Sequence, residues 1–229
     1  MFLRLAVPAV AFGLVACGAE KPAPAVPEQA APPPAAPVAG PLPQAMVRGI
    51  VRLTPTLSFR SCEGQSLMTL VDNSGGRLIS NYRLMQADES DGMYVLGRAA
   101  TSPSNELLLG EIEYAGLPGG TEGCQQPLPD YVISARGEDP AWRLTIGNGG
   151  IVFVREADQT SMNFPAVTPD DSAGRVRYQS TTGGDQSFHL LLDRNGCAGR
   201  RAGMYASMTA DLIIGGQTLR GCAWRGRLP

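Results

Sequence analysis

From Met46 onward, the chain consists of short runs in which apolar and polar residues alternate, closed by glycine-rich turns. In the clearest run, polar residues separate Trp142, Leu144 and Ile146. Asn148-Gly149-Gly150 then turns the chain into a further apolar run, and Asn-Gly is a strong hairpin signal. Alternation with a period of two places every second side chain on one face of a strand. Because such strands recur at short intervals without a long helical pattern, the sequence predicts a mainly all-β protein of antiparallel barrels or sandwiches.

The first part of this β region contains one short helical pattern. Leu78, Tyr82 and Met85 have the spacing of one helix face and lie between predicted strands. Two strands, a helix and two further strands fit a small OB-like barrel. A segment rich in Gly and Pro, 116–129, follows and indicates a domain boundary. We therefore predict an OB-like β-domain at 46–128 and a second antiparallel β-domain at 129–229.

The predicted strands are the apolar runs between turn residues. In the run that ends at Tyr114, alternation directs Glu111 and Glu113 outward and Ile112 and Tyr114 inward. The full set is Val47–Leu53, Leu67–Val71, Tyr94–Ala99, Leu107–Tyr114, Tyr131–Ala135, Trp142–Ile146, Ile151–Arg155, Arg175–Ser180, Phe188–Leu192, Met208–Ile214 and Gln217–Trp224.

The N-terminus has the pattern of a secretory signal peptide. One arginine precedes the apolar run Leu5–Val15, which is too short to cross a bilayer. The run ends in Leu14-Val15-Ala16-Cys17, which resembles the lipobox of bacterial lipoproteins. The resemblance implies that residues 1–16 are removed and that Cys17 carries lipid, with Gly18 favouring the outer membrane. The alternative is an ordinary signal peptide cut near Ala16.

Residues 17–45 are of low complexity, dominated by proline and alanine and almost uncharged. Such a segment cannot bury a hydrophobic core and favours extended, polyproline-like conformations. We predict a disordered stalk between Cys17 and the first domain. A polyproline ligand for another protein is the alternative, although the proline spacing is irregular.

The chain has five cysteines, and lipidation of Cys17 would leave four to pair in an oxidising compartment. Four cysteines allow three connectivities. We favour Cys62–Cys124 and Cys197–Cys222, because the predicted domain boundary separates these two pairs.

Two stretches resemble a family of uncharacterised bacterial envelope lipoproteins. Ala135–Trp142 contains Gly-x-acid-Pro-x-Trp, and Gly215–Ala223 contains Leu-x-Gly-Cys-Ala. The similarity extends over about Ile133 to Trp224, and it implies that Cys197 is the upstream partner of Cys222. The resemblance implies a fold and a cellular location but no activity.

Catalytic and metal-binding patterns are weak. The only histidine, His189, alternates with Phe188 and Leu190 on a predicted strand and is expected to point outward. The chain has no Gly-x-Ser-x-Gly motif, and bridged cysteines cannot serve as nucleophiles or zinc ligands. We interpret Trp142 as a core residue and the acidic turns 88–92 and 170–172 as solvated loops; weak calcium binding is the alternative for the first turn, although it lacks EF-hand spacing. We predict no catalytic residues, metal or cofactor; a carboxylate pair from different strands is the one catalytic arrangement that spacing cannot reveal.

The charge distribution gives the sharpest functional hypothesis. The formal net charge of −2 gives no reason to expect nucleic acid binding. Arginines nevertheless concentrate near the C-terminus, and arginine binds phosphates and carboxylates bidentately. The candidate anion-binding residues are Arg194, Arg200, Arg201, Arg220 and Arg225. The alternative is that these arginines are scattered, solvated charges.

Together these features predict a non-catalytic binding or structural module. It would be anchored by lipid in the outer membrane of a bacterial cell envelope, facing the periplasm. Peptidoglycan, lipopolysaccharide or another envelope protein would be its partner, and its oligomeric state stays open. An alternative function is lysozyme inhibition, because Asp171-Ser172-Ala173-Gly174 is weakly similar to the Ser-Gly loop of lipid-anchored lysozyme inhibitors.

Overall fold

The computed structural model describes residues 42–64, 66–85, 87, 91–120, 122–127, 129–172, 174–181, 186–198 and 203–228. Cys17, most of the predicted stalk, Arg200 and Arg201 lie outside these residues. Residues 41–229 form one compact unit. Its single helix among the described residues is α1 (Arg77–Leu84). The strands are β1 (Ala45–Thr54), β2 (Thr56–Ser61), β3 (Leu67–Asp72), β4 (Met93–Thr101), β5 (Leu107–Gly116), β6 (Ile133–Glu138), β7 (Ala141–Gly147), β8 (Gly150–Arg155), β9 (Thr160–Phe164), β10 (Asp170–Ser172), β11 (Arg175–Thr181), β12 (Ser187–Asp193), β13 (Cys197–Ala198), β14 (Met204–Ala206), β15 (Met208–Ile214) and β16 (Gln217–Arg225).

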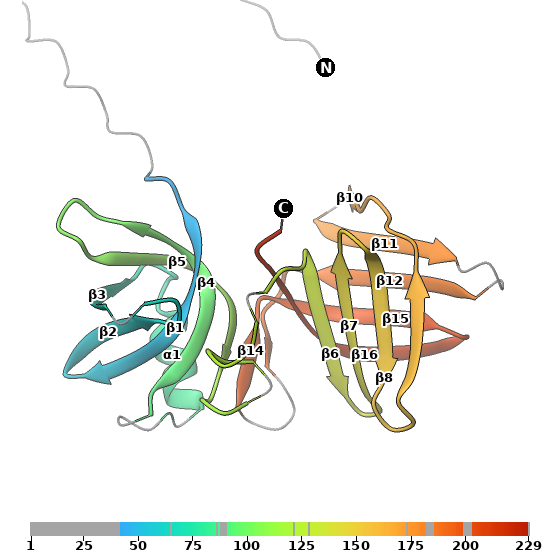
Figure 1. Ribbon diagram of the computed structural model, residues 1–229, viewed down its shortest axis with the longest axis horizontal. Coiled ribbons are helices and arrows are strands. Elements are labelled where there is room, and N and C mark those ends of the chain that lie inside the picture. The colour runs from blue at the N-terminus through green and yellow to red at the C-terminus, as the bar shows by residue number, and fades with distance from the viewer. Residues whose placement is uncertain are drawn as a thin grey trace, which may run out of the picture. The chain divides into compact units, whose positions relative to one another are not determined.

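The first five strands form a closed barrel (Figure 1). Strand β1 pairs with β2 and β4, β2 pairs with β3, β3 runs parallel to β5, and β5 pairs with β4. Helix α1 lies in the connection from β3 to β4 and contributes Leu78 and Tyr82 to the barrel core. This is the strand and helix order of an OB-like barrel, which confirms the predicted fold of this part. Strand β2 was not predicted; it follows β1 through a bend at Pro55.

Two bulges in β5 change the directions of its side chains. Tyr114 pairs with Leu96 and Ile112 pairs with Gly97, so Glu113 is an extra residue without a partner position on β4. A bulge interrupts the alternation of a strand. Ile112 therefore packs in the barrel core, whereas Tyr114 packs in a separate cluster outside it. The prediction that both face inward is wrong for Tyr114. The prediction of an exposed Glu113 is also wrong, because that side chain is fully buried.

The second sheet has nine antiparallel strands in the order β10-β11-β12-β15-β16-β6-β7-β8-β9. It curls on itself, and strands β6 to β8 cross in front of β11, β12 and β15 in Figure 1. Both halves share one hydrophobic core, in which the rings of Phe164 and Phe188 lie 5.2 Å apart. The predicted alternation is confirmed here, since Trp142, Leu144 and Ile146 are all buried. The short strands β9, β10, β13 and β14 were not predicted.

Trp142 is a core residue, as predicted, and two glycines make room for it. A Cβ atom at Gly137 would collide with the indole nitrogen of Trp142 and with the carbonyl oxygen of Arg220. One at Gly221 would collide with the carbonyl oxygen of Arg136 and approach the indole ring to 2.8 Å. The glycines of the two family-like motifs therefore meet around the same tryptophan.

The two sheets are joined by a strand from the second half of the chain. After β12, the chain leaves the nine-stranded sheet, and β14 pairs with β5 at the side of the barrel. Tyr94, Tyr114 and Trp224 pack together in the resulting junction, with the rings of Tyr114 and Trp224 4.8 Å apart. The predicted boundary at 128/129 falls in the connection between β5 and β6.

Both favoured disulfides are present. Cys62–Cys124 ties the end of β2 to the connection between the sheets, and Cys197–Cys222 ties β13 to β16. The second bridge therefore links the two sheets, whereas the prediction had assigned each bridge to a separate domain. All four cysteines belong to the hydrophobic junction or pack against it.

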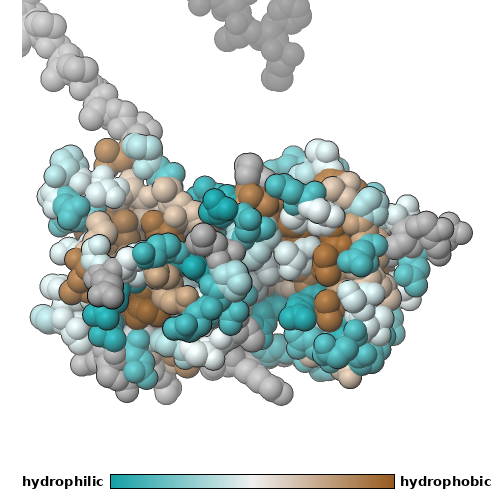
Figure 2. All heavy atoms as spheres, in the orientation of Figure 1, coloured by the Kyte–Doolittle hydropathy of each residue, from teal (hydrophilic) through white to brown (hydrophobic). Residues whose placement is uncertain are grey.

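No helix among the described residues is long and apolar enough to span a membrane. On the face shown in Figure 2, hydrophobic residues reach the surface in separate patches among hydrophilic ones.

Candidate functional site

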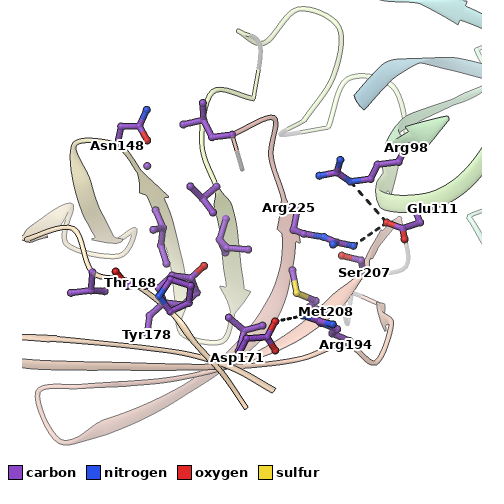
Figure 3. A pocket seen from close by; sticks show the side chains of 18 of the residues that line it. Arg98, Glu111, Asn148, Thr168, Asp171, Tyr178, Arg194, Ser207, Met208 and Arg225 are labelled. Atoms are coloured by element: carbon purple, nitrogen blue, oxygen red, sulfur yellow. Dashed lines mark hydrogen bonds and ion pairs between the residues drawn. The ribbon is translucent and has the colours of Figure 1, made fainter. Parts of the chain in front are cut away.

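A cleft of about 720 Å³ lies where the barrel meets the nine-stranded sheet (Figure 3). This volume falls within the range of small-molecule sites, roughly 300–1,000 Å³. The two halves of the curled sheet and the barrel all contribute to its walls. Its apolar lining consists of Ile112, Val132, Ile133, Ile146, Ala166, Val167, Pro169, Val176, Tyr178, Met208 and Leu228. An apolar floor is therefore available to a ligand that enters the cleft.

Charged side chains form the rim on the barrel side. Arg225 of β16 donates a hydrogen bond from its terminal nitrogen to Glu111 of β5 at 3.0 Å. Arg98 of β4 lies 4.0 Å from the same carboxylate. We call Arg98, Glu111 and Arg225 the rim cluster, and Figure 3 shows both arginines converging on Glu111. The cluster brings together residues from β4, β5 and β16.

Glu113 supports the rim cluster from beneath. Its side chain has no exposed surface, and one of its oxygens lies 2.8 Å from Nε of Arg225. Its other oxygen accepts hydrogen bonds from the Ser207 hydroxyl at 2.7 Å and from the backbone N–H of Arg225 at 3.3 Å. A buried carboxylate needs such partners, because an unpaired charge in an apolar interior is costly. Arg225 is thus held in place at both its backbone and its side chain.

A second charged pair, which we call the rim pair, also lines the cleft. Arg194, just after β12, donates a hydrogen bond to Asp171 of β10 at 2.6 Å. Both side chains are about half exposed. Tyr178 lines the cleft close by, and burial together with the negative charge of Asp171 raises the pKa of its hydroxyl. Asp171 belongs to the stretch that had suggested lysozyme inhibition, and here it lies in β10 and has an ion-pair partner.

The predicted anion-binding arginines do not all lie at one site. Arg194 and Arg225 line the same cleft. Arg220 lies elsewhere, 3.5 Å from Asp211, and lines a smaller groove of about 190 Å³ beside Cys197–Cys222. Arg200 and Arg201 are outside the described residues. Each predicted arginine that the structure describes therefore has an acidic partner.

The structure also places the other residues that were considered for catalysis or metal binding. His189 is exposed on β12, as predicted. Among the described residues, no group of three or more His, Cys, Asp or Glu side chains is placed to hold a metal ion. Glu111 and Glu113 are neighbouring carboxylates, but Arg225 bridges them and Glu113 has no surface with which to touch a ligand.

Neither Arg98 as a site residue nor the burial of Glu113 was predicted from the sequence. The contact of Glu113 with Arg225 joins residues 112 positions apart, and it depends on the bulge in β5. Alternation alone assigns Glu113 to a solvent-facing position. The only sequence feature that hints at the burial of Glu113 is that this carboxylate lies within the strongly apolar end of the strand.

Comparisons with protein-family models, with curated proteins and with solved structures gave no match to this chain.

Proposed function

We propose that this protein is a non-catalytic binding module of the bacterial cell envelope, anchored in the outer membrane by lipid on Cys17. It binds an anionic envelope component in the cleft between the barrel and the nine-stranded sheet. The lipobox-like stretch supports the anchor, and two disulfides favour an oxidising compartment such as the periplasm. The similarity to envelope lipoproteins is in keeping with this location and is part of the proposal.

One observation carries the ligand assignment. Arg194 and Arg225, which lie far apart in the sequence, line the same apolar-floored cleft. A guanidinium group offers two parallel N–H donors to a carboxylate or phosphate, which gives both strength and geometry to the contact. Their side chains are 58% and 43% exposed, so both can be reached from solvent.

The proposed role is binding because the carboxylates at the rim already have cationic partners. Glu111 interacts with Arg225, and Asp171 interacts with Arg194. The two ion pairs place charged groups of both signs at the cleft, which suits the recognition of a charged ligand.

The test is cosedimentation of the full chain with peptidoglycan sacculi and, separately, with lipopolysaccharide, comparing Arg194→Ala with a matched control. Arg175→Ala is that control, because Arg175 and Arg194 have equal exposure of 58% and similar ion pairs of 2.7 and 2.6 Å. Arg175 does not line the cleft. We expect about tenfold weaker binding for Arg194→Ala, equivalent to about 1.4 kcal/mol, and unchanged binding for Arg175→Ala.

Equal losses in the two variants would show that the cleft is not the binding site. Failure of the parent chain to bind either material would reject an anionic envelope component as the ligand.

A further inference from the structure

The cleft presents both signs of charge at the rim cluster and again at the rim pair. Next to Arg225 is the carboxylate of Glu111, and next to Arg194 is that of Asp171. These carboxylate side chains are 47% and 52% exposed, about as accessible as the arginines beside them. A ligand with only negative charge would meet an exposed carboxylate beside the arginine at both places, although Arg77 and Arg98 also line the cleft and add positive charge. A ligand that carries a positive and a negative group can satisfy both.

We propose that the ligand is a short peptide with a free carboxylate and a free ammonium group. This inference rests on the proposed function and narrows it. The carboxylate would accept hydrogen bonds from a rim guanidinium, and the ammonium would donate to Glu111 or Asp171. Among envelope components, peptidoglycan stem peptides have both groups, whereas lipopolysaccharide phosphates supply negative charge alone.

A ligand carboxylate could replace Glu111 as a partner of Arg225 without leaving the guanidinium unpaired. Its Nε faces the buried Glu113, while its terminal nitrogen bonds to the exposed Glu111. A ligand carboxylate can replace Glu111 on the terminal nitrogen while Glu113 still holds the guanidinium. Glu111, once released, is available to the ligand ammonium. Glu113 is thus a positioning residue that keeps Arg225 at the rim throughout.

The remaining lining suits a peptide as well. Val176, Ile133 and Ile146 offer an apolar surface to small side chains. Asn148 and Thr168 line the same cleft and can bond to peptide amides. An apolar floor with a few polar groups that fix orientation is the usual composition of a ligand site.

The experiment uses trialanine, whose only charges are its two termini. The full chain, held in lipid nanodiscs, is titrated calorimetrically with four forms of the peptide: free, N-acetylated, C-amidated and blocked at both ends. Acetate and inorganic phosphate are titrated in parallel. We expect each single block to weaken binding about tenfold, and both simple anions to bind more weakly than the free peptide.

Glu111→Gln locates the ammonium contact. The change should weaken binding of free trialanine but leave binding of N-acetyl-trialanine as it is in the parent chain, while Arg175→Ala should change neither. If instead N-acetyl-trialanine binds as tightly as the free peptide, or if phosphate binds more tightly and depends on Arg194, the peptide inference is wrong and the anionic-ligand proposal stands. If no peptide or anion binds and sacculi and lipopolysaccharide also fail to bind, both proposals fall.

Discussion

The side chains of Glu113 and Arg225 meet across the junction of the two sheets, with Nε of Arg225 2.8 Å from a fully buried carboxylate oxygen. Glu113 stands at a bulge of β5, and Arg225 is the last residue of β16. The contact therefore joins the barrel to the end of the nine-stranded sheet. It also determines where the guanidinium of Arg225 lies at the rim of the cleft.

Replacing Glu113 by Gln should destabilise the protein, because the change removes a buried charge from Arg225, Ser207 and Arg98. Breaking a buried ion pair costs about 3–5 kcal/mol. Since Arg225 is partly exposed and can be rehydrated, we expect a smaller loss of about 1–3 kcal/mol in the free energy of unfolding. Urea denaturation measures it. Glu111→Gln is the control, with a change of at most about 1 kcal/mol for an exposed pair; equal effects of the two changes would contradict this account.

Removing the disulfide Cys197–Cys222 by a double Cys→Ser change should lower the free energy of unfolding by about 3 kcal/mol. The bridge closes a sequence separation of 25 residues. Because it ties β13 to β16, hydrogen exchange should also accelerate at the amides of β14. Removing Cys62–Cys124 should cost at least as much, since its separation is 62 residues. Unchanged exchange in β14 would show that the bridge does not hold the two sheets together.

Gly137→Ala should destabilise the fold by at least about 2 kcal/mol, in the range of overpacked cores. The added methyl group would meet the indole of Trp142 and a backbone carbonyl oxygen, and the carbonyl cannot easily move aside. Gly149→Ala provides the control, because a Cβ at Gly149 meets nothing within 4 Å. Thermal unfolding of the two variants should separate them by several degrees. Similar midpoints would mean that the packing around Trp142 can relax.

The raised pKa of the Glu122 carboxyl predicts that the stability of the fold depends on pH. Burial raises the pKa of its carboxyl above the ordinary value of 4.5, although Arg136 and Arg48 oppose the shift. The folded state therefore binds the proton more strongly than the unfolded state, and this contribution to stability is lost as the pH rises from 4.5 through the raised pKa. Glu122→Gln should raise the unfolding midpoint at pH 7 relative to the parent chain. The difference should shrink towards zero below pH 4.5, and a difference that is constant with pH would contradict the assignment.

Cys17→Ser should abolish attachment of the protein to the outer membrane. Lipidation needs the thiol, and several acyl chains are required for stable anchoring. The measurement is incorporation of labelled palmitate together with membrane fractionation of the producing bacterium. Cys62→Ser is the comparison, since it also removes a cysteine but should still be labelled. Membrane attachment of Cys17→Ser at the level of the parent chain would exclude the proposed anchor.

Much of the fold follows from local patterns in the sequence. Alternation identified the strands that carry Trp142 and Phe188, and the helical spacing of Leu78 and Tyr82 identified α1. These patterns succeed because one face of each element is buried against a single core. The favoured cysteine pairing is confirmed as well.

The missed features depend on contacts between distant parts of the chain. Strand β14 is three residues long, and its pairing with β5 is not encoded in any local period. Tyr114 faces the junction because a bulge shifts it, and alternation cannot place a bulge. The rim cluster needs β4, β5 and β16 at one point, so only Arg225 of its three members was a predicted site residue.

The position of β14 also bears on how the protein is made. A nascent chain that has reached residue 128 holds all five barrel strands, but the partner of β5 on its outer side is still about seventy-five residues from being synthesised. Until Ala206 has emerged, Tyr114 lacks its neighbour on β14, and Glu113 lacks Ser207 and Arg225, which come later still. The junction on the outer side of β5 is therefore completed only near the end of translation, after Ala206 and Cys222 have been made. A gene fragment cut at the link between β5 and β6 would deliver a barrel with an open, aggregation-prone flank.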